Sequence, residues 1–565
     1  MATGYPSIDK PWMKYYSEEA INAELPKGSI YEYLWENNKS HFDDVALIYF
    51  HRKITYRELF ENIDKTAAAF SALGVSKGDI VTIQALSLPQ VIYMLYALSK
   101  LGAISNLIYA TLNAKEIAAN LKETKSKIYV TIDSIFHSFD IDIEGLEKVI
   151  LLSVEDEMNI IAKAAYKLTA KTKVKKKRNN ILSWKSFMSL SSSEIILNCS
   201  TPRDPVIMVY TGGTTGKSKA VMLSNFNLNI GALQYLPLGF ERHKRFLCVL
   251  PPFIAFGLIV TVHMPLVFGC ETVLGISMDP TEISGFVETY EPNYIICGTA
   301  QAEKMMNALK AKKTDLSCLT LLGVGGDALP ISLENSINKF LLERNSKTRI
   351  IQGYAMSETS ASSTAAIHTI HKQGTVGIPF VYTTVKIVDT NTNMELSYGE
   401  TGEICINAPC VMIGYYQNEE ETNSILRRHS DGKIWVHTGD IGSMDEDGFI
   451  TIVGRMKRMV LVSENSAFHK IFPKLIEDVL LKADGIKAIS IVGKPHKEKT
   501  NELIAFVVLD ERINHGKAMD SLEKLASSRL ESYECPAKYV IVEALPLTTV
   551  GKVDYLALEK IAAGD

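Results

Sequence analysis

The sequence predicts an α/β protein: a large N-terminal region of helix-covered parallel sheets plus a small β region, followed by a smaller α+β C-terminal region. Over the first four-fifths of the chain, apolar strand patterns alternate with helical patterns, which is typical of βα units in parallel sheets. From about Thr383 the pattern changes to short strands with turn signals, and after Arg455 a further set of helices and strands follows. With 565 residues, 46% of them hydrophobic, the chain can bury more than one core.

The large region contains a series of predicted strands. The run at 77–86 is followed by a helical pattern at 89–103, "PQVIYMLYALSKLGA". Further apolar runs of strand length stand between short connections and helical stretches, and they lie at 126–133, 146–153, 207–210, 292–298, 319–326 and 349–355. Because several of these runs are buried-strand patterns without polar alternation, we expect sheets covered on both faces.

The later elements predict two smaller units. Short strands bounded by turn residues lie at 384–389, 402–408 and 448–454. The final 110 or so residues have their own helical patterns, at 473–484 and 522–532, and their own strand patterns, at 487–495 and 502–510. A segment of this length with its own elements can form a separate domain. We therefore expect two domains, residues 1–455 and 456–565.

Composition excludes several classes of protein. The net charge is −4 and charged residues make up 22%, so nothing points to a nucleic-acid partner. The eight cysteines are scattered without a CxxC pair, which indicates neither a disulfide framework nor a zinc site. The N-terminus has no apolar run behind a basic start. We expect a cytoplasmic protein.

Two segments differ from this average composition. Residues 246–270 contain no Asp, Glu, Lys or Arg, which is long enough for a membrane span, but they include three prolines and two glycines. A strand, a turn and a buried helix explain them better. Residues 163–178 carry eight positive and no negative side chains. This run is either a solvated loop or a peripheral contact with an anionic inner membrane face, worth about 1 kcal/mol per basic residue.

The stretch "YTGGTTGKSKAV", residues 210–221, resembles the P-loop of NTPases at first sight. The P-loop needs a glycine five positions before Gly216, and Thr211 stands there instead. The segment nevertheless keeps the chemistry of a phosphate cradle, with glycines for close approach, hydroxyls and two lysines. It also follows an apolar strand directly, so a ligand-binding loop is favoured over a solvated connection.

Four other polar clusters stand at characteristic places. They are "YAMSE" (354–358) after a strand, Asp440 in "HTGDIG", Arg455 and Lys457 in "VGRMKR", and Lys552 in "LTTVGKVDY". Taken singly, each has an ordinary structural explanation, such as a helix cap or a surface charge. In this order and at these separations, from Ile54 to Lys552, the chain resembles the adenylate-forming superfamily: acyl-CoA synthetases, firefly-luciferase-like enzymes and nonribosomal-peptide adenylation domains. The fatty-acid CoA ligase branch is the most similar.

The resemblance implies a two-step reaction. A carboxylate attacks the α-phosphate of ATP to give acyl-AMP and pyrophosphate, and a thiol then attacks the acyl carbon and expels AMP. It also implies catalytic roles for Lys552, Glu358, Lys219 and Arg455, and a Mg²⁺ site at Glu358 and Thr214. The ATP-binding residues that it implies are Thr211, Gly212, Gly213, Thr214, Thr215, Gly216, Lys217, Ser218, Gly326, Asp327, Tyr354, Ser357, Asp440 and Arg455.

Within this set the resemblance assigns individual tasks. Tyr354 stacks on adenine, Asp440 accepts both ribose hydroxyls, and Lys552 bridges the substrate carboxylate and the α-phosphate. Ile254, Gly298 and Gly325 belong to the acyl pocket. Lys457 is the hinge about which the small domain rotates between the two half-reactions.

The sequence departs from the family pattern in three places. The phosphate loop ends in Ser218, Lys219 and Ala220, where Pro-Lys-Gly is usual, and Ile254 stands where many members carry histidine. After Lys457 the text "KRMVLVSENSAFHKIFPKLIED" contains no glycine, although members that make CoA thioesters have one there to let the pantetheine arm pass.

Three functions therefore remain open from the sequence. The first is a CoA ligase for a medium- or long-chain fatty acid. The second is an acyl-AMP ligase that loads the phosphopantetheine of an acyl carrier protein, in which case transfer to free CoA would be the slower half-reaction. The third is a non-catalytic protein that binds an acyl group or an adenylate.

Overall fold

The computed structural model describes residues 3–136, 146–169, 180–192, 199–211, 218–276, 279–367, 369–464, 467–496, 499–510, 513–547 and 553–564. Gly212, Gly213, Thr214, Thr215, Gly216, Lys217 and Lys552 lie outside these ranges, as does the basic stretch 170–178. The structural statements below concern the described residues.

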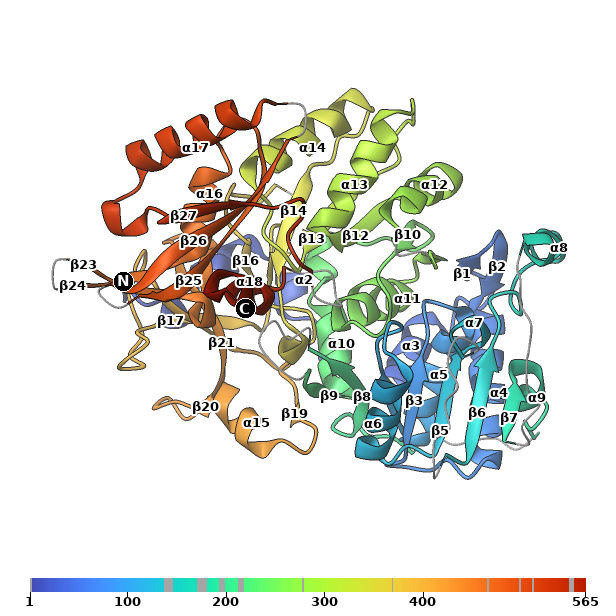
Figure 1. Cartoon of the computed structure of the whole chain (residues 1–565). Helices are drawn as coiled ribbons and strands as arrows, with labels where there is room; N and C mark the ends of the chain where they lie inside the picture. The colour runs from blue at the N-terminus through green and yellow to red at the C-terminus, as the bar shows by residue number, and fades with distance from the viewer. Residues whose placement is uncertain are drawn as a thin grey trace.

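The first large sheet has eight strands, six of them parallel. The antiparallel strands β9 and β19 extend it at one edge. In spatial order the strands are β19 (Gly414–Tyr415), β9 (Ala220–Ser224), β8 (Pro205–Tyr210), β4 (Ile104–Leu107), β3 (Ile80–Gln84), β5 (Ile128–Ile132), β6 (Lys148–Leu152) and β7 (Ile181–Ser183). Its helices are α4 (Tyr56–Ala72), α5 (Pro89–Leu101), α6 (Ala114–Thr124), α7 (Asp133–Phe136), α8 (Ile160–Thr169) and α9 (Trp184–Met188). This part lies at the lower right of Figure 1.

Helix α5 is buried along its whole length. It begins with Pro89, whose missing N–H costs nothing in the first turn, and it ends before Gly102, which has φ of +70°. All thirteen of its residues are buried. The hydroxyl of Tyr96 on this helix and Nδ1 of His263 form a hydrogen bond of 3.0 Å. Helix α5 therefore joins the two large sheets.

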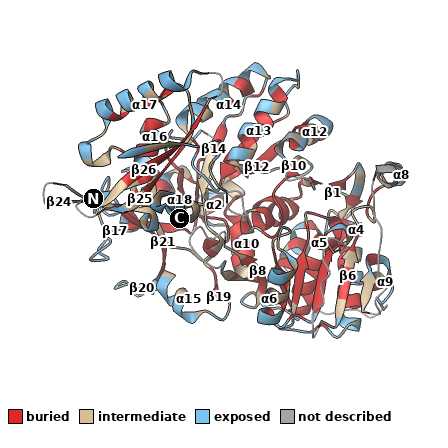
Figure 2. Cartoon of the chain, in the orientation of Figure 1, coloured by how far each residue is buried: buried red, intermediate tan, exposed pale blue. Residues whose placement is uncertain are grey.

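The second large sheet has nine strands and lies beside the first. Its order is β16 (Ile378–Pro379), β15 (Thr364–Ala365), β14 (Ile350–Tyr354), β13 (Leu321–Gly325), β12 (Tyr294–Gly298), β10 (Arg245–Cys248), β11 (Glu271–Leu274), β1 (Val45–Tyr49) and β2 (Arg52–Thr55). One face carries α12 (Pro280–Tyr290), α13 (Thr299–Lys310) and α14 (Ile331–Glu343) (Figure 1). The central strands of both sheets are buried (Figure 2). Every strand predicted for the large region is present, and the predicted α/β class is confirmed.

Residues 246–270 form the predicted strand, turn and buried helix. The strand is β10, and the helix is a π-helix at Gly257–His263 that continues into α11 (Met264–Val267). The π-helix packs against α10 (Asn225–Leu233) and against β10, so it lies on the face of the nine-stranded sheet that carries α10. Within the described ranges, no helix is both long and apolar enough to cross a bilayer.

The N-terminal residues lie along the body of the protein. Their elements are α1 (Pro6–Asp9), a 3₁₀ turn at Pro11–Tyr15, α2 (Glu18–Ile21) and α3 (Ile30–Asn38). Trp12 is fully buried, and the Tyr16 hydroxyl donates to the Pro379 carbonyl at 2.7 Å.

The small β region predicted after Thr383 is a five-stranded antiparallel sheet. Its strands are β17 (Thr384–Val388), β18 (Gly402–Asn407), β20 (Leu426–Arg428), β21 (Ile434–Met444) and β22 (Ile450–Arg455), with α15 (Glu419–Ile425) beside them. Strands β21 and β22 bring Asp440 and Arg455 into register as direct partners.

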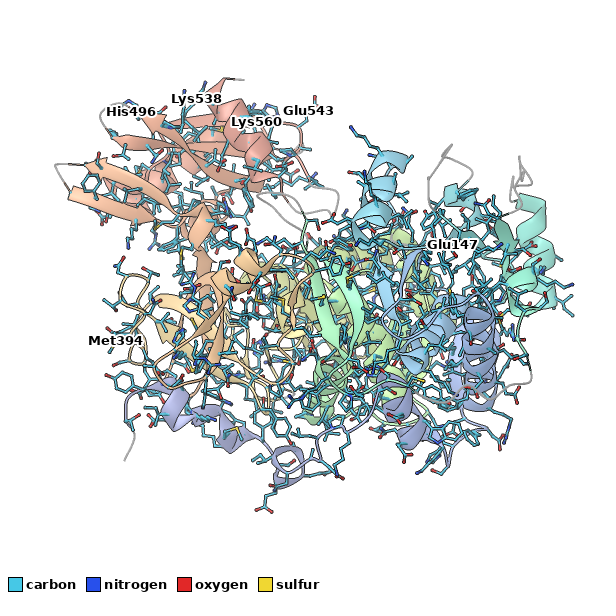
Figure 3. All side chains as sticks on the ribbon, turned by 90° about the horizontal axis from the view of Figure 1, so that it is seen from below. Glu147, Met394, His496, Lys538, Glu543 and Lys560 are labelled. Carbon is cyan, nitrogen blue, oxygen red and sulfur yellow. The ribbon has the colours of Figure 1, made fainter. Side chains whose placement is uncertain are left out.

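The C-terminal region has its own sheets and its own buried clusters. Strands β23 (Val460–Glu464) and β24 (Ala467–Ile471) form a hairpin, while β25 (Ile486–His496), β26 (Thr500–Leu509) and β27 (Lys538–Ile541) form a three-stranded sheet. Its helices are α16 (Pro473–Leu480), α17 (His515–Arg529) and α18 (Tyr555–Ala563). The labelled His496, Lys538, Glu543 and Lys560 mark this region in Figure 3, at one end of the molecule.

Candidate active site

Three of the predicted ATP-binding residues meet around one carboxylate. The Tyr354 hydroxyl, at the end of β14, donates to Oδ2 of Asp440 at 2.6 Å. Arg455 Nε lies 2.8 Å from Oδ1 of the same carboxylate. Asp440 is only 3% exposed, so these two donors take the place of the water that it would bind at the surface.

The charges in this group support one another. The Asp440 carboxylate raises the pKa of Arg455, and burial together with the nearby Asp440 charge holds the pKa of Tyr354 well above its usual value. At neutral pH the site therefore contains a neutral tyrosine and an ionised arginine. Each carboxylate oxygen has two acceptor positions, so each can accept one hydrogen bond in addition to the one that a protein group supplies.

Glu358 lies in the 3₁₀ turn Ser357–Thr359 that follows β14, and Ser357 begins this turn. Glu358 is 6% exposed, and its Oε1 accepts a hydrogen bond from the Tyr415 hydroxyl at 2.6 Å. Burial, followed by the charge of Glu358, raises the pKa of Tyr415. Tyr415 comes from β19 and was not among the predicted residues.

The base of the glycine loop is closed by hydrogen bonds. The Thr211 N–H donates to the Lys219 carbonyl at 3.0 Å, and the Lys219 N–H donates to the Thr211 hydroxyl at 3.2 Å. Ser218 Oγ donates to the Thr211 carbonyl at 2.5 Å. These contacts bring the two ends of the loop together and hold Lys219 at its exit.

Lys219 points toward residues that the sequence analysis did not identify. Its Nζ lies 2.5 Å from a carboxylate oxygen of Glu421 on α15 and 4.9 Å from the centre of the Tyr415 ring. The hydrogen bond from Lys219 lowers the pKa of Glu421, and the charge of Lys457 contributes to the same shift. Tyr415 thus lies between Glu358 and Lys219.

The ends of β12 and β13 meet at glycines. Gly298 and Gly325 are direct partners in the parallel register. A Cβ on Gly325 would lie 3.3 Å from the Phe256 ring and 3.4 Å from the Gly353 carbonyl, so the backbone and this ring approach closely there. Gly326 has φ of +88°, which favours glycine. Ile254, two residues before Phe256, is partly buried. Phe256 was not among the residues predicted for the acyl pocket.

Asp327 follows these glycines at the same edge. Its carbonyl accepts hydrogen bonds from Thr299 Oγ1 at 3.1 Å and from Gln352 Nε2 at 3.3 Å. Burial is the main cause of the raised pKa of Tyr555, and Asp327 and Arg455 are among the charges that act on it. Tyr555 is the first residue of α18 and follows Lys552 by three positions, so charges of the ATP-binding group act on the start of this helix.

Lys457 lies in the 3₁₀ turn Met456–Arg458, directly after β22, and it is exposed. The next residue, Arg458, lies 2.7 Å from a Glu477 carboxylate oxygen and 3.6 Å from the centre of the Tyr555 ring. Arg458 thus joins this turn to both α16 and α18.

The glycine-free loop after Lys457 is the β23–β24 hairpin. Glu464 and Ala467 are cross-strand partners at its end, while Asn465 and Ser466 lie outside the described residues. Thr500 donates its hydroxyl hydrogen to Ser463 Oγ at 3.3 Å.

Comparison with known proteins agrees with this arrangement. The family profile "AMP-binding enzyme" matches residues 34–416, and "AMP-binding enzyme C-terminal domain" matches residues 475–552. The chain is 27% identical over 559 residues to a long-chain-fatty-acid–CoA ligase of Bacillus subtilis, covering 96% of each chain. It is also 27% identical over 575 residues to a protein of the same name from Salmonella typhimurium, covering 97% of each.

Solved structures share the fold. An anthranilate CoA ligase in complex with anthranoyl-AMP superposes with a TM-score of 0.81 at 19% identity, covering 96% of this chain and 99% of that one. The o-succinylbenzoate CoA synthetase of Bacillus subtilis, in complex with its acyl-adenylate, gives 0.75 at 22% identity, covering 95% and 99%.

Proposed function

The chain belongs to the AMP-binding enzyme family, and we propose that its acid substrate is a medium- or long-chain fatty acid. It is an AMP-forming acid–thiol ligase: it activates a carboxylic acid with ATP to acyl-AMP, and it then transfers the acyl group to CoA. The choice of a fatty acid is supported by relatives that are named long-chain-fatty-acid–CoA ligases and match nearly the whole chain.

The observation that carries the assignment of adenylation is the convergence of Tyr354 and Arg455 on the buried carboxylate of Asp440. A carboxylate with one remaining acceptor position on each oxygen can accept the two hydroxyls of a ribose. We assign the adenosine subsite to this group, with Ser357, Gly326 and Asp327 beside it. The aromatic ring of Tyr354 offers a face on which adenine can stack.

We assign the phosphate subsite to residues 211–219, with Lys219 at the loop exit. The first half-reaction brings two anions together, so it needs cations and N–H donors where negative charge accumulates. Lys219 and Arg455 are such cations, and both already lie against carboxylates at the site. Pyrophosphate oxygens would replace Glu421 as the partner of Lys219.

Glu358 and Thr214 are the residues that would hold Mg²⁺. The donor set fits a hard cation, because Glu358 offers a carboxylate oxygen at a buried position, and Tyr415 lies between it and Lys219. When bound, the ion neutralises charge on the phosphates. The Tyr415 hydroxyl orients the Glu358 carboxylate through its bond to Oε1.

We further propose that residues 1–455 and 456–565 act as two domains joined at Lys457, and that Lys552 enters the site for adenylation and leaves it for thiol transfer. Two observations support this division: the separate buried clusters beyond residue 459, and the contacts of Arg458 with Glu477 and Tyr555. Through these contacts a rotation at Lys457 would carry α18, and with it the lysine loop, as one body.

The acyl pocket is assigned to Ile254, Gly298 and Gly325, together with Phe256. The close approach of Phe256 to Gly325 supports this assignment, because an apolar wall next to a side-chain-free strand end suits an alkyl chain. Isoleucine at position 254 makes that wall more apolar than a histidine would.

CoA is the thiol acceptor that the names of the relatives support, and we propose the phosphopantetheine of an acyl carrier protein as a second candidate. The absence of glycine in the loop after Lys457 favours this second acceptor, since a side chain narrows a path for pantetheine. A quenched reaction with saturating CoA distinguishes the two. Acyl-AMP that accumulates with CoA, but is cleared faster by a carrier protein, would select the carrier.

We also propose a peripheral contact with an anionic membrane through residues 163–178. The described part of this segment belongs to α8, at the right-hand edge of Figure 1. Ile160 and Ile161 at its start are 88% and 83% exposed, while Ala162 and Tyr166 pack against the core. Exposed aliphatic side chains next to a basic run suit an anionic lipid surface.

The test of the proposed function is ATP–pyrophosphate exchange with a panel of carboxylic acids, from acetate to long-chain fatty acids, including aromatic acids. Exchange that rises with alkyl chain length supports the proposal. Exchange with aromatic acids alone would contradict the fatty-acid assignment, and no exchange with any acid would contradict adenylation itself.

A further inference from the structure

Three potential metal ligands lie together in the five-stranded sheet, outside the ATP-binding group. Cys405 on β18 and His437 on β21 are direct cross-strand partners, and His429 lies between β20 and β21. His429 Nε2 is 2.8 Å from His437 Nε2, and Cys405 Sγ is 3.7 Å from His437 Nδ1. One donor atom from each of the three residues lies within 4.8 Å of the others.

A carboxylate fixes the orientation of the central histidine. Glu403 Oε2 lies 2.7 Å from Nδ1 of His437. Since an ionised carboxylate only accepts hydrogen bonds, Nδ1 carries a hydrogen, and in the neutral ring the lone pair is then on Nε2, facing His429. This carboxylate–histidine arrangement is the one that usually supports a histidine ligand of zinc.

We propose that Cys405, His429 and His437 form a binding site for a zinc-like divalent ion, with Glu403 as the supporting carboxylate. Thiolate and imidazole are ligands that zinc prefers, at about 2.3 Å for sulfur and about 2.0 Å for nitrogen. At these lengths a tetrahedral ion would hold the two nitrogens roughly 3.3 Å apart. The histidine nitrogens, now 2.8 Å apart, would therefore separate by only a fraction of an ångström. Cys405 Sγ lies 3.7 Å from Nδ1 of His437, so its side chain would have to turn toward the two Nε2 atoms.

The proton and charge changes balance. The ion replaces the hydrogen bond between the two histidines, the His429 hydrogen moves from Nε2 to Nδ1, and the Cys405 thiol proton passes to solvent. The two positive charges of the ion are then matched by the thiolate and by the Glu403 carboxylate, as a buried site requires. The nearby Lys386 lies 3.8 Å from Asp431, so that ion pair adds no net charge.

The half-buried His429 leaves one side of the proposed site open to solvent. Cys405 and His437 are buried, whereas His429 is half-buried and reaches the surface. An ion can enter from the His429 side and keep a water molecule there as its fourth ligand.

Occupancy of this site would stiffen the part of strand β21 that carries Asp440. Glu403 uses its second oxygen, Oε1, to accept the Gly439 N–H at 3.0 Å. Gly439 has φ of +68°, a local irregularity of strand β21 between His437 and Asp440. The proposed ion and Glu403 therefore hold the backbone on the N-terminal side of Asp440. The metal site itself does not depend on the proposed function.

The test uses the full chain, stripped of metal with a chelator and then titrated with Zn²⁺ against a chromophoric chelator. His429→Gln and Cys405→Ser should each weaken Zn²⁺ binding by at least about tenfold. His243→Gln, at an exposed histidine, and Cys318→Ser, at a half-buried cysteine, are the matched controls and should bind as the wild type does. Co²⁺ in the wild type should give a thiolate charge-transfer band.

Three results would overturn the proposed metal site. If the wild type binds no Zn²⁺, or if His429→Gln binds it as tightly as the wild type, the three side chains form only a hydrogen-bonded relay to Glu403. A Co²⁺ spectrum without a thiolate band also overturns the site as described. Because His429 is half-buried, its variant and the wild-type Co²⁺ spectrum decide the question even if Cys405→Ser does not fold.

Discussion

Tyr354 and Asp440, 86 positions apart in the chain, are joined by a 2.6 Å hydrogen bond from the tyrosine hydroxyl to the aspartate carboxylate. This bond links the nine-stranded sheet to the five-stranded one at the proposed adenosine subsite. The geometry of that subsite therefore depends on how the two sheets are held together.

The ribose assignment predicts a strong preference for ATP over dATP. Asp440→Asn keeps the size of the side chain but removes the charge that Arg455 and Tyr354 bind. Hydrogen bonds to charged groups contribute about 1.5–3 kcal/mol, so kcat/KM for ATP should fall roughly tenfold to a hundredfold. Asp447→Asn, at an exposed aspartate that pairs with Lys14, is the control. Equal use of dATP and ATP by the wild type would refute the assignment.

The role proposed for Lys552 predicts that the two half-reactions respond differently to its removal. Lys552→Ala should slow adenylate formation by two to three powers of ten, since a group that stabilises transition-state charge is worth about 3–4 kcal/mol. Thioester formation from supplied acyl-AMP should change much less. Lys560→Ala, on α18 (Figure 3), is the control. Equal loss in both half-reactions would be incompatible with the role.

The ion pair between Lys219 and Glu421 predicts a competition with ATP. Because Glu421 holds the lysine that the phosphates need, Glu421→Gln should lower the KM for ATP. Exposed and half-exposed pairs contribute about 0.2–1 kcal/mol, which corresponds to a decrease of up to roughly fivefold. Glu420→Gln on the same helix should have no such effect. The difference in KM between the wild type and Glu421→Gln should shrink at high ionic strength. If Glu421→Gln leaves the KM for ATP unchanged at low salt, the predicted competition does not occur.

The membrane proposal predicts salt-sensitive binding to anionic vesicles. Replacing Lys173, Lys175, Lys176, Lys177 and Arg178 with Gln should reduce sedimentation with such vesicles at low salt, while turnover of a short, soluble acid stays nearly unchanged. Ile160→Ser with Ile161→Ser should weaken binding further. Leu342→Ser, at an aliphatic residue of α14 that is 69% exposed, is the control. Partitioning that ignores salt, or no partitioning at all, would leave 163–178 as a solvated segment.

Much of the fold follows from local sequence patterns. The apolar runs at 126–133 and 146–153 became β5 and β6, because runs of this length and composition are stable chiefly as buried parallel strands. The charge-free stretch at 246–270 was correctly assigned to the core, but its helix is of the π type. The helix begins at Gly257, where a Cβ would lie 2.2 Å from the Pro251 carbonyl, a contact that no periodicity reveals.

The candidate site, like the fold, contains residues that the sequence predicts and residues that it does not. Tyr354, Glu358, Asp440 and Arg455 could be predicted because their order and separations resemble those of the adenylate-forming superfamily, and the structure brings Tyr354, Asp440 and Arg455 together. Tyr415 and Glu421 were missed. Tyr415 contacts Glu358 from 57 positions away and Glu421 contacts Lys219 from 202 positions away, so their place depends on how β19 and α15 pack.

The complete burial of α5 limits how this chain can be divided into fragments. A fragment that ended before β10 would keep seven of the strands of the eight-stranded sheet, without β19, and would lose the residues that cover α5, including His263. It would expose a continuous apolar surface, which promotes aggregation during expression. Studies that use truncated protein should therefore keep both large sheets in one piece, and shortened versions are better made near residue 455 than between the sheets.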